Sequence, residues 1–133
     1  VITVSPIRYA KYGFHGSQLS KATLLLAADR LVRQNPGIVS YFPAYELMND
    51  ELRDYRFYEE DMLHPSSQAV EFIWQRFRAA YFGRAAEQFL EDWRPIREAH
   101  GHKPFHPDSE AHQRFLAKTE EMERRFNEKY FNS

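Results

Sequence analysis

The sequence predicts an α/β domain, helix-rich overall, followed by an antiparallel pair of helices. Two short runs of β-branched and aromatic residues flank one long amphipathic helix pattern, whereas only helical periodicity follows residue 82. A strand, a helix and a second strand over such a length are typical of a right-handed parallel crossover. We therefore expect an α/β part with few parallel strands in residues 1–82 and a helical extension in residues 83–133.

The first strand is expected in residues 1–5, where β-branched residues form the continuous apolar run of a buried strand. Only residues 38–42 offer a second good strand, and two short strands make a poor sheet by themselves. We therefore expect this sequence to be part of a larger domain whose other strands lie outside it. An unpaired sheet edge would then favour homodimers or aggregation.

The helix between the two strands is expected from about residue 18 to residue 34. Ser17 is placed as its N-cap, and Asn35-Pro36-Gly37 ends it. The apolar residues of this helix form a broad face, which suits packing against a sheet.

Beyond the second strand, a short helix is expected near residues 43–46, followed by a polar, aromatic-rich connection over residues 49–63. Pro65 suits the first turn of the next helix, which continues over residues 66–82. Apolar residues recur at helical spacing in this segment, so we assign its inner face to the core.

In the helical extension, the sequence predicts two helices joined by a turn. Residues 84–99 form an amphipathic helix interrupted by Pro95, and Ser109 caps a last helix with a narrow apolar stripe, which also suits a homodimer seam. The turn carries four potential metal ligands, which are His100, His102, His106 and Asp108. Because a turn rich in Gly and Pro exposes such side chains without binding an ion, we assign no metal and no cofactor.

Composition excludes several classes of function. A formal net charge of −1 gives no overall attraction to nucleic acid or to an anionic membrane, so neither is expected as a partner. The absence of cysteine excludes disulfides, thiolate metal sites and a cysteine nucleophile. No apolar run approaches the roughly 20 residues that cross a bilayer. The compartment stays open, with the cytoplasm favoured.

Asp61 and His64 are the residues best suited to catalysis. A carboxylate three residues before a histidine can accept a hydrogen bond from one imidazole nitrogen and leave the other free to take a proton from a nucleophile. The alternative is a structural contact in a turn, with Pro65 and Ser66 simply starting a helix. A serine nucleophile would complete a catalytic triad with these two residues.

Five sequence blocks stand out before residue 80. They are Thr3-Val4-Ser5-Pro6-Ile7, Gln18-Leu19-Ser20-Lys21-Ala22, Tyr41-Phe42-Pro43-Ala44-Tyr45-Glu46, Asp50-Glu51-Leu52-Arg53-Asp54-Tyr55-Arg56-Phe57-Tyr58 and Asp61-Met62-Leu63-His64-Pro65-Ser66. In this order they resemble the C-terminal half of a GSCFA domain, and the fourth block is hard to obtain by chance. Residues beyond about 83 add nothing to the resemblance.

GSCFA domains are similar to SGNH-type ester hydrolases, so the resemblance implies a flavodoxin-like three-layer α/β/α sandwich and a Ser–His–Asp site. Asp61 and His64 match the family's Asp-x-x-His block. The resemblance places the nucleophilic serine in a Gly-Ser-Cys-Phe-Ala signature that precedes residue 1. It also places the Gly and Asn donors of the oxyanion hole ahead of residue 1. We therefore expect a fragment of a serine esterase for a small-molecule or carbohydrate ester, inactive alone. The alternative is a non-catalytic scaffold or interaction module.

Ser5 is the best internal candidate for a nucleophile, because it lies at the carboxyl end of a strand. Pro6 follows it directly and a long loop precedes the helix, unlike a nucleophile elbow. A serine that hydrogen-bonds its own turn is therefore the favoured interpretation.

Side chains that follow the carboxyl ends of the two strands are predicted to line a substrate cleft. They are Arg8, His15, Tyr45 and Glu46. The competing interpretation is that they are solvated loop residues.

Overall fold

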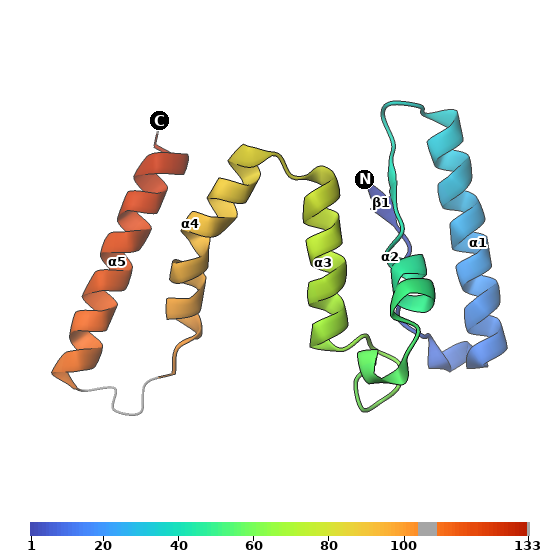
Figure 1. The fold of residues 1–133 in the computed structure, drawn as a ribbon, viewed down its shortest axis with the longest axis horizontal. Helices are drawn as coiled ribbons and strands as arrows, with labels where there is room; N and C mark the ends of the chain where they lie inside the picture. Colours follow the sequence, from blue (N-terminus) through green and yellow to red (C-terminus); the bar gives the residue numbers. More distant parts are fainter. Residues whose placement is uncertain (104–108, 133) are drawn as a thin grey trace. The chain divides into compact units, whose positions relative to one another are not determined.

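The computed structural model describes residues 1–103 and 109–132. The chain forms two compact units, Val1–Tyr81 and Phe82–Ser133. The described residues are mostly helical, and their one sheet has two strands (Figure 1). Within the described parts of the chain, no helix combines the length and apolar character that a membrane span requires.

The sheet of the first unit consists of β1 (Ile2–Thr3) and β2 (Tyr41–Phe42), which run parallel. Helix α1 (Gly13–Gln34) connects them, so the predicted parallel crossover is confirmed. Both strands are shorter than the apolar runs that predicted them. The reason is that backbone pairing defines a strand, and in the described residues each strand has one neighbour only.

Helix α1 begins at Gly13, so the prediction of a start near residue 18 with Ser17 as N-cap is wrong. A turn of 3-10 helix, η1 (Ala10–Tyr12), leads into it, and Gly13 adopts a φ of 69° that favours glycine. Ser17 is buried inside the helix, where its Oγ accepts a hydrogen bond from the Tyr9 amide at 3.1 Å. Ser17 thus fixes the incoming chain instead of capping the helix.

Two helices cover opposite faces of the sheet. Phe42 meets α3 (Ser67–Tyr81), with its ring centroid 5.1 Å from that of Phe77. Tyr41, the preceding residue, lines a hollow with residues of α1. Because successive side chains of a strand point to opposite faces, α1 and α3 lie on opposite sides of the strands, as Figure 1 also shows.

The segment after β2 is more helical than predicted. Helix α2 (Ala44–Glu46) continues directly into a π-helical stretch, η2 (Leu47–Leu52), which ends where Arg53 adopts a left-handed backbone. A short 3-10 helix, η3 (Tyr55–Phe57), follows. Met48 of η2 is 1% exposed, so this segment supplies core side chains that a polar connection would not.

The second unit is a hairpin of α4 (Arg84–Gly101) and α5 (Glu110–Tyr130). Three of its ring contacts, in chain order from α4 to its C-cap His102, are Phe89 with Tyr130, Trp93 with Phe126 and His102 with Phe115. Partners on α5 run backwards as α4 advances, so the helices are antiparallel, as predicted. The predicted N-cap is also present, since Ser109 Oγ accepts from the His112 amide at 3.2 Å.

Pro95 lies inside α4 without interrupting it, contrary to the prediction. A proline within a helix costs about 3 kcal/mol, because it removes one hydrogen bond and crowds the preceding turn. Burial of each large apolar side chain contributes about 1.5–3 kcal/mol. Ile96, which is 1% exposed, and Trp93, packed on Phe126, together offset that cost.

Candidate active site

The Asp61–His64 pair is held by a turn that the aspartate itself organises. Asp61 Oδ1 accepts hydrogen bonds from the amides of Leu63 at 2.8 Å and His64 at 3.0 Å. Asp61 Oδ2 lies 2.5 Å from His64 Nδ1. A short carboxylate side chain readily bonds amides two and three residues ahead, so this spacing alone favours the arrangement. The structure therefore brings the two predicted catalytic residues together.

The same hydrogen bonds set the charge of the aspartate. The amide of His64, then its imidazole and the amide of Leu63, lower the pKa of Asp61 to about 2. Asp61 is therefore a carboxylate at neutral pH and accepts the proton on His64 Nδ1. In the neutral imidazole this leaves the lone pair on Nε2, which is the tautomer that a general base needs.

Both members of the pair are open to solvent. The side chain of His64 is 58% exposed and that of Asp61 is 44% exposed. A histidine that served only to fill a core would be buried. Nε2 of His64 can therefore be reached by a substrate or by another protein segment.

The loop that carries the pair is closed by backbone contacts. Tyr58 and Pro65 form an antiparallel bridge, and the Glu59 amide donates to the His64 carbonyl at 2.8 Å. Ser66 caps α3, since its Oγ accepts from the Ala69 amide at 3.3 Å. The pair is thus built into a short closed loop at the start of α3.

Arg8 fastens this loop to the segment that leaves β1. Its backbone amide donates to the Leu63 carbonyl at 3.0 Å, and its Nη1 donates to the Met62 carbonyl at 3.3 Å. Its guanidinium lies 4.1 Å from the ring centroid of Tyr58. Of the four residues predicted to line a substrate cleft, Arg8 is the one that contacts the loop of the pair.

The other three predicted cleft residues lie elsewhere. His15 is exposed in the first turn of α1, because that helix starts earlier than expected. Tyr45 donates from its hydroxyl to Gln18 at 2.9 Å, and Glu46 accepts from the Tyr41 hydroxyl at 2.9 Å. No hydrogen bond, ion pair or ring contact described in the structure joins these residues to the Asp61–His64 pair.

Ser5 is engaged as the favoured interpretation predicted. Its Oγ accepts from the Ile7 amide at 3.4 Å, a turn contact, and its carbonyl accepts from buried Lys21 Nζ at 2.5 Å. Among residues 1–103 and 109–132, no serine hydroxyl is hydrogen-bonded to His64. The nucleophile of a triad is therefore not part of the described arrangement.

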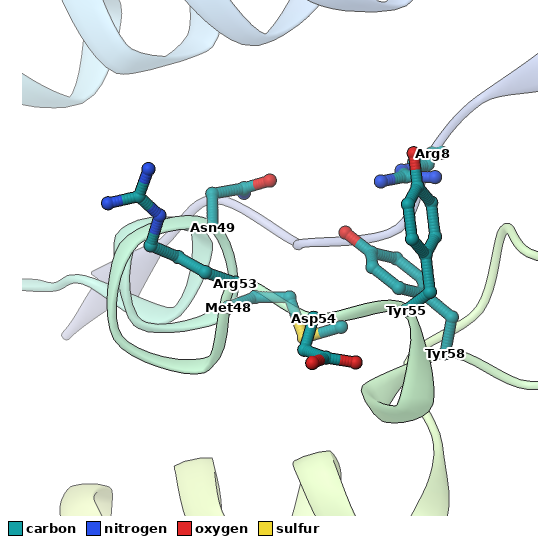
Figure 2. A pocket seen from close by; sticks show the side chains of 7 residues that line it. All are labelled: Arg8, Met48, Asn49, Arg53, Asp54, Tyr55 and Tyr58. Carbon is teal, nitrogen blue, oxygen red and sulfur yellow. The ribbon is translucent and has the colours of Figure 1, made fainter.

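A hollow of about 180 Å³ adjoins the loop of the pair; we call it the arginine pocket (Figure 2). Its lining consists of Arg8, Met48, Asn49, Arg53, Asp54, Tyr55 and Tyr58. Of these residues, only Arg8 was predicted to belong to a site. The others come mostly from the fourth family-like block, which was the one available signal, but no periodicity showed that its side chains converge.

His100 and His102 of the second unit make structural contacts. His100 pairs with Glu123, and the ring of His102 lies 5.1 Å from that of Phe115. His106 and Asp108, the other two potential metal ligands, lie outside the described residues. Within the described chain, no three His, Asp or Glu side chains are grouped as a metal site would require.

Two family models together match most of the sequence. No curated protein and no solved structure matches the chain significantly. The GSCFA family model matches residues 1–77, and the model of the C-terminal domain of GSCFA domain proteins matches residues 93–133. The expectation that family resemblance ends near residue 83 is therefore wrong, since the helical hairpin is also a family feature. The chain belongs to the GSCFA family.

Proposed function

We propose that this chain supplies the histidine and aspartate of a Ser–His–Asp ester hydrolase. The observation that carries the proposal is the 2.5 Å contact between Asp61 Oδ2 and His64 Nδ1 in an exposed turn that leaves Nε2 free. Such a pair holds an imidazole in the tautomer and orientation that activate a serine. The serine itself lies outside residues 1–133 in this proposal.

The chemistry proceeds in two halves. His64 Nε2 takes the proton of the serine hydroxyl as its oxygen attacks the ester carbonyl, and then gives that proton to the departing alcohol. Water attacks the acyl-serine in the same way, which releases the acid and restores the serine. Asp61 stays ionised and stabilises the imidazolium. Backbone and side-chain donors outside this chain stabilise the oxyanion.

The fold supports this proposal at the level of layers. Two parallel strands lie between α1 and α3, the order that an SGNH-like three-layer sandwich requires. Apolar side chains of α1 stay exposed, among them Leu24, Leu26 and Leu31, at 49%, 73% and 47%. An open face and open strand edges leave room for further strands and helices. The substrate class is a small-molecule or carbohydrate ester.

A non-catalytic scaffold is the second candidate, and one observation favours it. Asp61 Oδ1 already bonds two backbone amides, so Asp61 stabilises its turn whether or not His64 reacts. In that case the Asp–His contact would be a structural feature, and the family would act by binding a partner.

Covalent labelling distinguishes the two candidates. A fluorophosphonate probe forms a serine–phosphorus bond with loss of fluoride, and only an activated serine reacts quickly. We expect a GSCFA protein that extends upstream of residue 1 to gain one adduct by intact mass. His64→Ala should abolish the adduct, whereas His15→Ala, a second exposed histidine of the same unit, should keep it.

The 133-residue chain should gain no adduct. If this chain did gain an adduct, and His64→Ala removed it, the nucleophile would lie within residues 1–133. Ser5 would then be the best candidate. An extended protein that never reacts, although it folds, would support the scaffold instead.

A further inference from the structure

We propose that the arginine pocket binds the carboxylate of an acidic ester, next to the bond that the Asp61–His64 pair cleaves. This inference deepens the proposed function and rests on it. The substrate is thus narrowed to esters that carry a negative charge, such as a monoester of a dicarboxylic acid or an ester of an acidic sugar.

The charge of the pocket favours an anion. Two arginines, Arg8 and Arg53, are among its lining residues, together with one acidic residue, Asp54. The carboxylate of Asp54 is occupied by Arg56, whose amide donates to Oδ1 at 2.9 Å and whose Nε lies 3.8 Å from Oδ2. Figure 2 shows the Asp54 carboxylate pointing away from Arg8. The pocket therefore keeps a net positive charge for a ligand.

Arg8 presents a guanidinium whose position is already fixed. Its Nη1 donates to the Met62 carbonyl, and its Cζ lies over the rings of Tyr58 and Tyr55, at 4.1 and 5.5 Å from their centroids. A guanidinium has five N–H donors, so most remain available. Because the side chain is already ordered, a ligand would bind with little loss of side-chain entropy.

Arg53 is the second cation, and its backbone is left-handed. It adopts a φ of 44°, stabilised by a bond from its amide to the Met48 carbonyl at 3.2 Å. Arg53 is the C-cap of η2, and a left-handed residue at this position is a common way for a helix to end. The guanidinium of Arg53 makes no hydrogen bond or ion pair within the described chain. Figure 2 places it across Asn49 from Arg8.

The pocket and the catalytic pair share a wall. Arg8 lines the pocket and donates from its amide to the Leu63 carbonyl, between Asp61 and His64. Tyr58 also lines the pocket and forms the bridge with Pro65, the residue after His64. A hollow of about 180 Å³ accommodates a small acidic group. A carboxylate held there would orient the rest of an ester along this loop.

The test measures binding without turnover. Monomethyl succinate, which carries one carboxylate and one ester, is added to the 133-residue chain, and the arginine Nε–Hε signals are followed by NMR. We expect saturable shifts at Arg8 and Arg53, and none from dimethyl succinate, which lacks the charge. Arg53→Gln should weaken binding about tenfold, as loss of a charged hydrogen-bond partner does. Arg30→Gln, an exposed arginine of α1, should leave binding unchanged.

Three results would overturn the inference. They are the absence of saturable shifts, equal shifts with the uncharged diester, and equal effects of the Arg53 and Arg30 substitutions. If an extended protein takes the fluorophosphonate label but its arginine signals do not respond, the hydrolase proposal stands and the proposal of an acidic substrate is rejected. Saturable binding in an extended protein that is never labelled overturns the assignment to a substrate.

Discussion

Asp61 in the first unit and Asp92 in the second both have a lowered pKa, but the groups that lower it differ. The pKa of each is lowered to about 2. The donors to Asp61 come from Leu63 and His64, within three residues of it. The donors to Asp92 are mainly Lys129 Nζ and the Tyr130 hydroxyl, each at 2.6 Å and on the other helix of the hairpin.

A lowered pKa therefore does not by itself mark a catalytic carboxylate. Asp92 uses its charge to join α4 to α5, and all its described partners are groups that stabilise the hairpin. Asp61 uses one oxygen to hold its turn and the other to orient an imidazole whose far nitrogen is open. The free Nε2 of His64, and not the acidity of Asp61, indicates catalytic chemistry.

The largest expected effect separates the two aspartates by activity. In a GSCFA protein that contains the serine, Asp61→Asn should lower kcat for ester hydrolysis by about 10³- to 10⁴-fold, because the imidazole loses its orienting carboxylate. Asp92→Asn should leave kcat unchanged. Steady-state kinetics on a chromogenic ester would measure both, and an equal loss in the two variants would contradict the distinction.

The next effect compares the cores of the two units. Met48 and Ile96 are the largest side chains with under 2% exposure, one in each unit. Truncation of either to alanine should cost about 2–5 kcal/mol, since it removes buried methylene groups and leaves a cavity. Native-state hydrogen exchange should show the loss of protection in the unit that carries the substitution. Equal loss in both units would mean that they unfold together.

A stabilising substitution is expected in the second unit. Pro95→Ala should raise the stability of the α4–α5 hairpin by about 1–2 kcal/mol, because the helix regains one backbone hydrogen bond while the unfolded chain gains some entropy. Thermal unfolding by circular dichroism measures the change. Pro36→Ala, in the turn after α1, is the matched control and should not stabilise. A fall in stability at Pro95 would show that the proline suits its site.

The smallest effect concerns acid stability. Both aspartates have a folded-state pKa of about 2, below the ordinary value of 3.8, so each favours folding while ionised. That contribution is present above about pH 4 and is lost as pH falls towards 2. Carboxyl-carbon NMR should give midpoints near 2 for both. Asp92→Asn should flatten the acid dependence of the hairpin's stability, and a midpoint near 4 would contradict the described contacts.

Short-range features followed from the sequence. The Asp61–His64 contact, the Ser109 cap and the two-helix hairpin were predicted, because each depends on residues a few positions apart or on a long periodic pattern. The parallel crossover was predicted as well, from two apolar runs around a helix pattern. The start of α1 was missed because Ser17, which resembles an N-cap, lies buried inside the helix. The continuity of α4 through Pro95 was missed because burial of neighbouring side chains such as Ile96 offsets the cost of the proline.

The site divides along the same line. The contact between Asp61 and His64 is encoded locally, since a carboxylate three residues ahead of a histidine can bond both the backbone of the turn and the imidazole. The contact of Arg8 with this turn and the pocket that Arg8 lines with Arg53 depend instead on tertiary packing, as do the separate positions of His15, Tyr45 and Glu46. Arg8 is 54 positions from Met62 and 45 positions from Arg53. The geometry of these contacts depends on how β1, η2 and the loop before α3 pack, which no local pattern encodes.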